Sequence, residues 1–278
     1  MSASNVREAL AAARARGVDR LDAQLLLAHV LERPRTWLLA HDDAVLTSAQ
    51  AAAFSAGVAR RAGGEPLAYV IGAKEFHGLV LQTRRGVLVP RPDTETLVDW
   101  AIELLRESFT GVASPRVADL GTGTGAIALA VKRAVPSARV TAIDKSPDAL
   151  ALAAANAAAL GLGIECLEGD WWDAVGARCF DLAVANPPYI AEGDPHLQAL
   201  RDEPPMALVS GSDGLDAIRR IVAGARARLA PGAWLLLEHG HDQVAPAAAM
   251  LQRAGFAAVQ SRTDLAGIVR CTGGRCPT

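Results

Sequence analysis

Cysteine is scarce in this sequence, and its spacing narrows the functions that the chain can have. Only four of the 278 residues are cysteines, and no two of them form a Cys-x-x-Cys pair: Cys166, Cys179, Cys271 and Cys276. This spacing excludes zinc ribbons and thioredoxin-like redox motifs. We therefore expect reduced thiols in a cytoplasmic protein, and no metal site.

The sequence also lacks an excess of one charge and any long apolar run. The 28 basic and 30 acidic residues give a net charge of −2, whereas dedicated nucleic-acid binders commonly carry a strongly basic surface. We therefore expect no direct nucleic-acid substrate. No apolar run is long enough to cross a bilayer, and the opening "MSASNVREALAAARARG" has no uninterrupted apolar core. We expect neither a signal peptide nor a membrane partner.

The first part of the chain has the pattern of helices. Residues 21–32 repeat apolar side chains at helical spacing and stop near Pro34. Thr47 and Gln50 form a possible capping box for a second helix that ends near residues 63–64. Because no alternating pattern precedes about residue 67, we expect a small helical N-terminal domain over residues 1–77.

Two short apolar stretches follow this helical region. Residues 79–84 and 86–90 flank a break at Arg85-Gly86, which predicts a β-hairpin that serves as a linker over residues 78–90. Residues 91–107 then have the pattern of a helix with Pro92 in its first turn. This helix would open the second domain, residues 91–278.

Strands and helices alternate in the second domain. This alternation is typical of a Rossmann-like, doubly wound and mostly parallel sheet. The last two strands are expected to form an antiparallel pair, although the loose end of the chain leaves the last one poorly defined. The seven predicted strands span residues 116–120, 139–144, 164–170, 180–186, 233–240, 257–264 and 267–272.

A glycine-rich loop joins the first of these strands to its helix in "DLGTGTGAIALA", residues 119–130. Glycine allows the backbone to approach a ligand closely, and the helix after the loop offers free N–H groups. We therefore expect a cofactor over the loop residues Gly121, Thr122, Gly123, Thr124 and Gly125. With Ala126 the loop also fits the loose dinucleotide fingerprint, so the loop alone does not name the cofactor.

Acidic and aromatic side chains follow the next two strands. Asp144 is placed to accept hydrogen bonds from ribose hydroxyls, or to cap the helix that starts at Ser146-Pro147, and both roles are compatible. Asp170 is placed to accept from an exocyclic adenine amine. One of the two adjacent tryptophans is expected to cover the adenine face while the other packs in the core, and we favour Trp171 over Trp172 for the adenine.

The fourth strand ends in "VANPPYI", residues 184–190. Proline restricts the residue before it to extended angles and has no N–H, so this segment is stiff and presents acceptors. If the Asn186 side-chain oxygen and the Pro187 carbonyl each accept one N–H of a planar NH₂ group, its nitrogen lone pair is held toward an electrophile. Pro188 adds stiffness, and Tyr189 would lie against the flat face of the substrate.

The pair "DLGTGTG" and "NPPY" resembles the class I S-adenosylmethionine-dependent methyltransferases that modify sp² nitrogens. Further stretches look like the protein-(glutamine-N5) methyltransferases that modify peptide chain release factors. The similarity covers nearly the whole chain, and it is most specific where "NPPY" occurs together with "RPDTE". These further stretches are "GEPLAYVIGAKEFHGL", "VPRPDTETLV", "NPPYI", "DPHL", "EPPMAL" and "LLLEHG".

The resemblance implies S-adenosylmethionine as cofactor, with its ribose at Asp144 and its adenine near Trp171. It implies the glutamine of the Gly-Gly-Gln loop of class 1 release factors as substrate. Asn186, Pro187 and Tyr189 would hold the side-chain amide, and the helical N-terminal domain would bind the rest of the factor. Methylation of this loop would modulate translation termination.

Some alternatives stay open from the sequence. "RPDTE", with Asp93 and Glu95, is either only a helix start or also a border of the active site. Glu238-His239 is a strand end with satisfied polar groups rather than a catalytic histidine, because the proposed chemistry needs none. The other functions are a ribosomal-protein glutamine methyltransferase, a DNA or RNA amino-methyltransferase, a nicotinamide oxidoreductase and a non-catalytic binding module.

Overall fold

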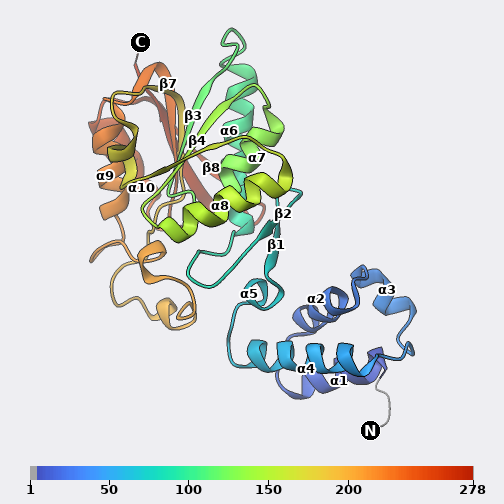
Figure 1. The fold of residues 1–278 in the computed structure, drawn as a ribbon. Coiled ribbons are helices and arrows are strands. Elements are labelled where there is room, and N and C mark those ends of the chain that lie inside the picture. The colour runs from blue at the N-terminus through green and yellow to red at the C-terminus, as the bar shows by residue number, and fades with distance from the viewer. Residues whose placement is uncertain (1–4, 278) are drawn as a thin grey trace. The chain divides into compact units, whose positions relative to one another are not determined.

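The computed structural model describes residues 5–277 and divides the chain into two compact units, Met1–Lys74 and Glu75–Thr278. Up to β1, the regular elements of the first unit's described part are helices (Figure 1). They share a hydrophobic core that includes Leu26, Leu27 and Phe54. Its helices are α1 (Val6–Ala15), α2 (Arg20–Leu31), α3 (Arg35–Ala40), α4 (Ser48–Ala62) and α5 (Leu67–Ile71).

The helix ends of this unit follow from side-chain caps. The predicted capping box is confirmed: the Thr47 side chain accepts from the Gln50 N–H, and Gln50 accepts from the Thr47 N–H at 2.9 Å. Asn5 and Glu8 form a second capping box at the start of α1. These bonds satisfy N–H groups that have no partner within the helix.

The predicted β-hairpin exists, but the predicted partners were wrong. The two strands are β1 (Ala73–Phe76) and β2 (Leu79–Gln82), and residues 86–90 form no strand. The turn falls at His77 and Gly78, whose φ values of 49° and 72° suit a tight two-residue hairpin turn. Val87 and Val89 are buried without belonging to a strand: Val87 packs on α8, and both valines line a cavity.

The second unit contains a seven-stranded sheet in the order β5-β4-β3-β6-β7-β9-β8, which confirms the predicted fold class. The first five strands of this order, from β5 through β4, β3 and β6 to β7, are parallel to one another. Strand β9 is antiparallel to both of its neighbours, β7 and β8. The strands are β3 (Arg116–Leu120), β4 (Arg139–Asp144), β5 (Glu165–Glu168), β6 (Phe180–Ala185), β7 (Leu229–Glu238), β8 (Ala257–Thr263) and β9 (Val269–Arg275).

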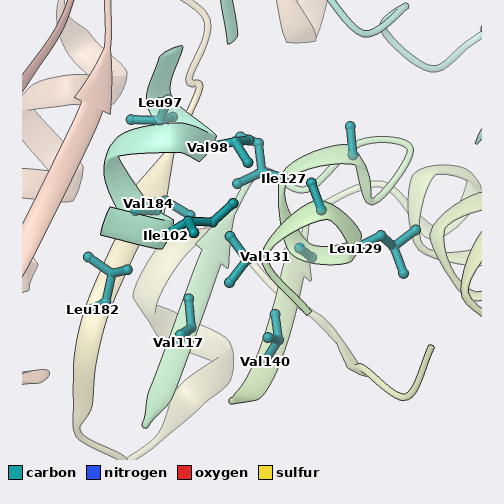
Figure 2. Packing of buried hydrophobic residues seen from close by; sticks show 14 of the residues in the cluster. Leu97, Val98, Ile102, Val117, Ile127, Leu129, Val131, Val140, Leu182 and Val184 are labelled. Atoms are coloured by element: carbon teal, nitrogen blue, oxygen red, sulfur yellow. The ribbon is translucent and has the colours of Figure 1, made fainter. Parts of the chain in front are cut away.

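Helices cover both faces of the sheet. One face packs on α6 (Glu95–Glu107), α7 (Ala126–Ala134) and α8 (Pro147–Leu160), and Figure 2 shows the α6 and α7 side chains meeting those of β3, β4 and β6. The other face packs on α9 (Asp216–Ala225) and α10 (Val244–Arg253).

Helix α10 was not predicted from the sequence, and one residue explains why. Pro246 interrupts its pattern, but proline is tolerated in a first helical turn. Within residues 5–277, no helix is long and apolar enough to cross a membrane.

Candidate active site

A cavity of about 410 Å³ opens where strands β3 to β6 end. Ligands of parallel α/β sheets bind at this carboxyl edge. Most of the predicted cofactor residues line it: Gly121, Thr122, Gly123, Thr124, Asp144, Asp170, Trp171 and Asn186, together with the predicted substrate residue Pro188. Pro187 and Tyr189 lie instead beside a smaller cavity of about 70 Å³, which shares Asn186 with the first.

Hydrogen bonds fix the glycine loop in a shape that only glycine adopts easily. Gly121, Gly123 and Gly125 all have positive φ, at 76°, 56° and 82°. The N–H of Gly123 donates to Asp144 Oδ2 at 2.8 Å. Gly125 does not line the cavity. A Cβ at this residue would stand 3.1 Å from Leu129 and 3.2 Å from Ala153, so it serves helix packing.

Asp119, which no pattern in the sequence singled out, holds the same loop through its side-chain carboxyl. Its Oδ2 accepts from the Thr122 hydroxyl at 2.6 Å and from the Ala128 N–H at 3.1 Å. Its Oδ1 is buried without a hydrogen-bond partner among the described residues. Complete burial raises the pKa of this carboxyl to about 7, against the lowering effect of its two hydrogen bonds.

Asp144 combines a loop contact with a helix contact. Its Oδ1 accepts from the Ser146 N–H at 2.9 Å, and Ser146 in turn caps α8. Burial raises its pKa, while hydrogen bonds from Ser146 and Gly123 act in the opposite direction. Each oxygen keeps a second lone pair, so the carboxylate is able to accept further bonds from the cavity side.

The two adjacent tryptophans lie in different environments. Trp171 lines the cavity, and its ring comes within 3.1 Å of the position that a Cβ on Gly121 would take. Trp172 is buried in the core, where its Nε1 donates to the Ile221 carbonyl at 2.8 Å.

Asp170, which lines the same cavity, forms ion pairs with two cations. Its Oδ2 lies 3.0 Å from Arg220 and 3.4 Å from Lys145. Partial burial opposes ionisation of Asp170, but these two cations outweigh it and lower the pKa. No local pattern in the sequence indicated these partners.

Asn186 is held by a residue from the "RPDTE" stretch. Its Nδ2 donates to Thr94 Oγ1 at 3.0 Å, and Thr94 lines the same cavity. The stretch therefore starts a helix and also borders the cavity, because a 3₁₀ helix over Pro92–Thr94 leads directly into α6. No local pattern in the sequence signalled the contact of Thr94 with Asn186.

Pro187 and Tyr189 differ in the contacts of their backbone carbonyls. Among residues 5–277 no hydrogen bond reaches the Pro187 carbonyl. The Tyr189 carbonyl accepts from Gln243 Nε2 at 2.9 Å, which ties the segment to the start of α10. Burial raises the pKa of the Tyr189 phenol far above its ordinary value, so the phenol is neutral.

The end of β7 places two polar residues behind this segment. His239 is buried, and its ring nitrogens lie 2.8 Å from the Gly240 carbonyl and 2.7 Å from the Thr272 hydroxyl. Burial lowers its pKa, so the ring is neutral and satisfied, as expected of a structural histidine. Glu238 is also buried, but its Oε2 has no hydrogen-bond partner within the described part of the chain.

The strand order and the residues at the sheet edge define a Rossmann-like methyltransferase. Two family descriptions match the chain: a PrmC N-terminal domain over residues 4–72 and a methyltransferase small domain over residues 94–203.

Proteins named release factor glutamine methyltransferase are similar to this chain over almost its whole length. A release factor glutamine methyltransferase of Bordetella pertussis is 50% identical over 261 residues, which is 93% of this chain and 95% of the relative. One from Escherichia coli K12 is 41% identical and covers 97% of each chain. This chain belongs to the release factor glutamine methyltransferase family.

Solved structures of lower identity share the fold. A 16S rRNA N2 methyltransferase of T. thermophilus, solved with AdoMet and guanosine, is 21% identical with a TM-score of 0.54, over 73% of this chain and 49% of its own. A methyltransferase from Pyrococcus furiosus is 15% identical with a TM-score of 0.53, over 72% of this chain and 90% of its own.

Proposed function

We propose that this chain transfers a methyl group from S-adenosylmethionine to the side-chain amide nitrogen of the glutamine in the Gly-Gly-Gln motif of class 1 release factors. The observation that carries the proposal is the position of Asn186. It lines the same cavity as the glycine loop, and its amide is held by Thr94. Family membership supports the choice of a release factor as substrate, since the relatives carry that name.

The cavity fits S-adenosylmethionine in size and in chemistry. A volume of about 410 Å³ lies within the usual range of small-molecule sites. Ala126 and Ile127, the first residues of α7, line it, and the start of a helix favours an anionic group such as a carboxylate. Asp144 would hold the ribose hydroxyls, and the Trp171 ring would cover the adenine.

Asp170 would accept from the exocyclic amine of the adenine through Oδ1, the oxygen that the two cations do not contact in the structure. Arg220 and Lys145 keep the carboxylate ionised, which strengthens it as an acceptor. A neutral carboxylic acid at this position would direct its own O–H at the amine, which is itself a donor, and would weaken the binding of the adenine.

When bound, the cofactor supplies an electrophilic methyl group on a sulfonium. The residues of the chain hold the nucleophile. Asn186 Oδ1 and the Pro187 carbonyl would each accept one amide N–H, which leaves the nitrogen lone pair directed out of that plane. Delocalisation makes an amide nitrogen a poor nucleophile, so positioning and two well-placed acceptors would supply most of the rate enhancement.

The methylation of purified release factor tests the proposal directly. Label from S-adenosylmethionine should enter wild-type release factor and should be absent from a variant whose Gly-Gly-Gln glutamine is replaced by alanine. Label in the replaced variant would show a different target residue. Label in ribosomal protein or nucleic acid, with none in release factor, would overturn the proposed substrate.

A further inference from the structure

Glu238 lies beside Asn186 at the edge of the sheet, although the two residues are far apart in sequence. Ala185 of β6 pairs with Leu237 of β7, so the residues that follow them, Asn186 and Glu238, occupy equivalent positions on adjacent strands. Glu238 is 1% exposed and does not line either cavity. It is therefore behind Asn186 and has no path to a substrate.

The side chains of Thr94 and Asn186 lie next to the Glu238 carboxyl. Both act on this carboxyl as hydrogen-bonding groups that lower its pKa. Asn186 Nδ2 also donates to Thr94 Oγ1 at 3.0 Å. Three side chains from the segment before α6, the end of β6 and the end of β7 thus form one polar cluster.

The donors and acceptors of this cluster determine which way the Asn186 amide points. Because Asn186 Nδ2 donates to Thr94 Oγ1, the Thr94 hydroxyl keeps its own proton for another acceptor, and the adjacent Glu238 carboxylate, when ionised, only accepts. Thr94 Oγ1 then has only lone pairs to offer, and the group of Asn186 that faces it must be the NH₂. The carbonyl oxygen of Asn186 is left for the cavity side.

We propose that Glu238 is a positioning residue: through Thr94 it fixes the orientation of the Asn186 side chain so that Oδ1 is presented to the substrate amide. This inference rests on the proposed function and adds a residue to it. Without the carboxylate, Thr94 is free to donate to Asn186, and the amide can turn its NH₂ toward a substrate that itself offers only N–H groups.

The protonation of Glu238 provides a readout for this role. Burial raises its pKa to about 7, and its charged and titratable neighbours come from three segments: Asp93, Tyr189, and Arg270 with Cys271 on β9. Asp93 raises this pKa further, whereas Arg270 and the bonds from Thr94 and Asn186 lower it. A protonated Glu238 donates to Thr94, so the orienting effect is lost below about pH 7 and present above it.

Two variants test the role by turnover. Glu238→Gln keeps the size of the side chain, and Thr94→Val removes only the hydroxyl. Each should lower kcat for release factor about tenfold or more, with the Kd for S-adenosylmethionine changed less than about twofold. Thr94→Ser should recover most of the loss seen in Thr94→Val, because it restores the hydroxyl.

The pH profile separates positioning from simple support of the fold. Wild-type kcat should rise with pH through about 7, and this rise should be absent in Glu238→Gln. Unchanged kcat in Glu238→Gln or Thr94→Val would overturn the proposal. So would a loss of kcat that accompanies an equal loss of cofactor binding. If Glu238→Gln does not fold, the two Thr94 variants decide the question by themselves.

A measurement without release factor separates this proposal from the proposed function. The side-chain ¹⁵N amide resonance of Asn186, assigned by its loss in Asn186→Ala, should shift with a midpoint near pH 7 in the wild type and not in Glu238→Gln. If release factor is not methylated but the resonance titrates in this way, only the substrate assignment fails. A resonance that stays constant between pH 6 and 8.5 overturns the role of Glu238.

Discussion

At the scale of the residue, Asn186 is the side chain on which the proposed chemistry depends most. Replacing it with alanine removes one of two acceptors for the substrate amide, so kcat should fall by about 100-fold or more. Cofactor affinity should change little, since Gly121–Thr124, Asp144 and Trp171 remain in the cavity wall. Single-turnover methylation and calorimetric titration of S-adenosylmethionine measure the two effects separately.

The matched control is Gln252→Ala, which removes an exposed amide from α10. It should leave both quantities as in the wild type. An Asn186→Ala variant that keeps more than about a tenth of the wild-type kcat would contradict the role of Asn186 as an acceptor.

Asp119 makes the stability of the protein depend on pH. Burial raises its pKa from 3.8 to about 7, so between these values the folded state keeps a proton that the unfolded state releases. Stability linked to Asp119 is therefore complete below about pH 4 and is lost as the pH rises to about 7, by up to roughly 4 kcal/mol.

An Asp119→Asn variant tests this sign, because it has no proton to lose. Its free energy of unfolding minus that of the wild type should be clearly higher at pH 8 than at pH 5, as measured by urea titration. Glu238 titrates in the same range in both proteins and cancels in this difference. An equal difference at both pH values would contradict the buried, proton-retaining state of Asp119.

At the scale of the element, Glu203 ties together two segments that line the larger cavity. It is buried, accepts from the Val89 N–H at 3.2 Å and pairs with Arg91. Val89 and Arg91 line the cavity from one segment, and Pro204 lines it from the other. Arg91 is only partly buried, so removing Glu203 leaves a partly hydrated charge and a buried N–H without its partner, which costs about 1–3 kcal/mol.

We therefore expect Glu203→Ala to lower the free energy of unfolding by about 1–3 kcal/mol and to weaken cofactor binding. The control is Asp202→Asn at the neighbouring residue. It breaks an ion pair at 3.0 Å with the largely exposed Arg85, and such an exposed pair stabilises the fold by less than about 1 kcal/mol. Equal losses in the two variants would show that burial of Glu203 does not set its contribution.

The elements also show why part of the site could be predicted from sequence and part could not. The glycine loop and "NPPY" are local motifs, in which glycine freedom and proline stiffness act within a few residues, so Gly121–Thr124 and Asn186 were found at the cavity. Thr94 and Glu238 act through contacts that exist only after the sheet forms, whereas Asp119 bonds to Thr122 and Ala128 within its own strand–loop–helix segment. Residues 86–90 misled the hairpin prediction because a short apolar run that lines a cavity resembles a buried strand, and all five of these residues line the larger cavity.

At the scale of the whole molecule, each of the two units has its own hydrophobic core. The first is built around Leu27 and Phe54, and the second lies on both faces of the sheet. All residues that line the larger cavity belong to the second unit. We therefore expect a fragment of residues 75–278 to fold and to bind S-adenosylmethionine with a Kd within about threefold of the full chain.

The same fragment should methylate release factor poorly, with kcat/KM at least 100-fold below the full chain, if the first unit recognises the factor outside its Gly-Gly-Gln loop. A short peptide that contains Gly-Gly-Gln separates this effect from damage to the site. Because the peptide reaches only the second unit, fragment and full chain should methylate it at similar, low rates. A fragment that keeps the kcat/KM of the full chain toward intact release factor would show that recognition lies wholly in the second unit. A fragment that fails on the peptide would show instead that the first unit is needed to form the site itself.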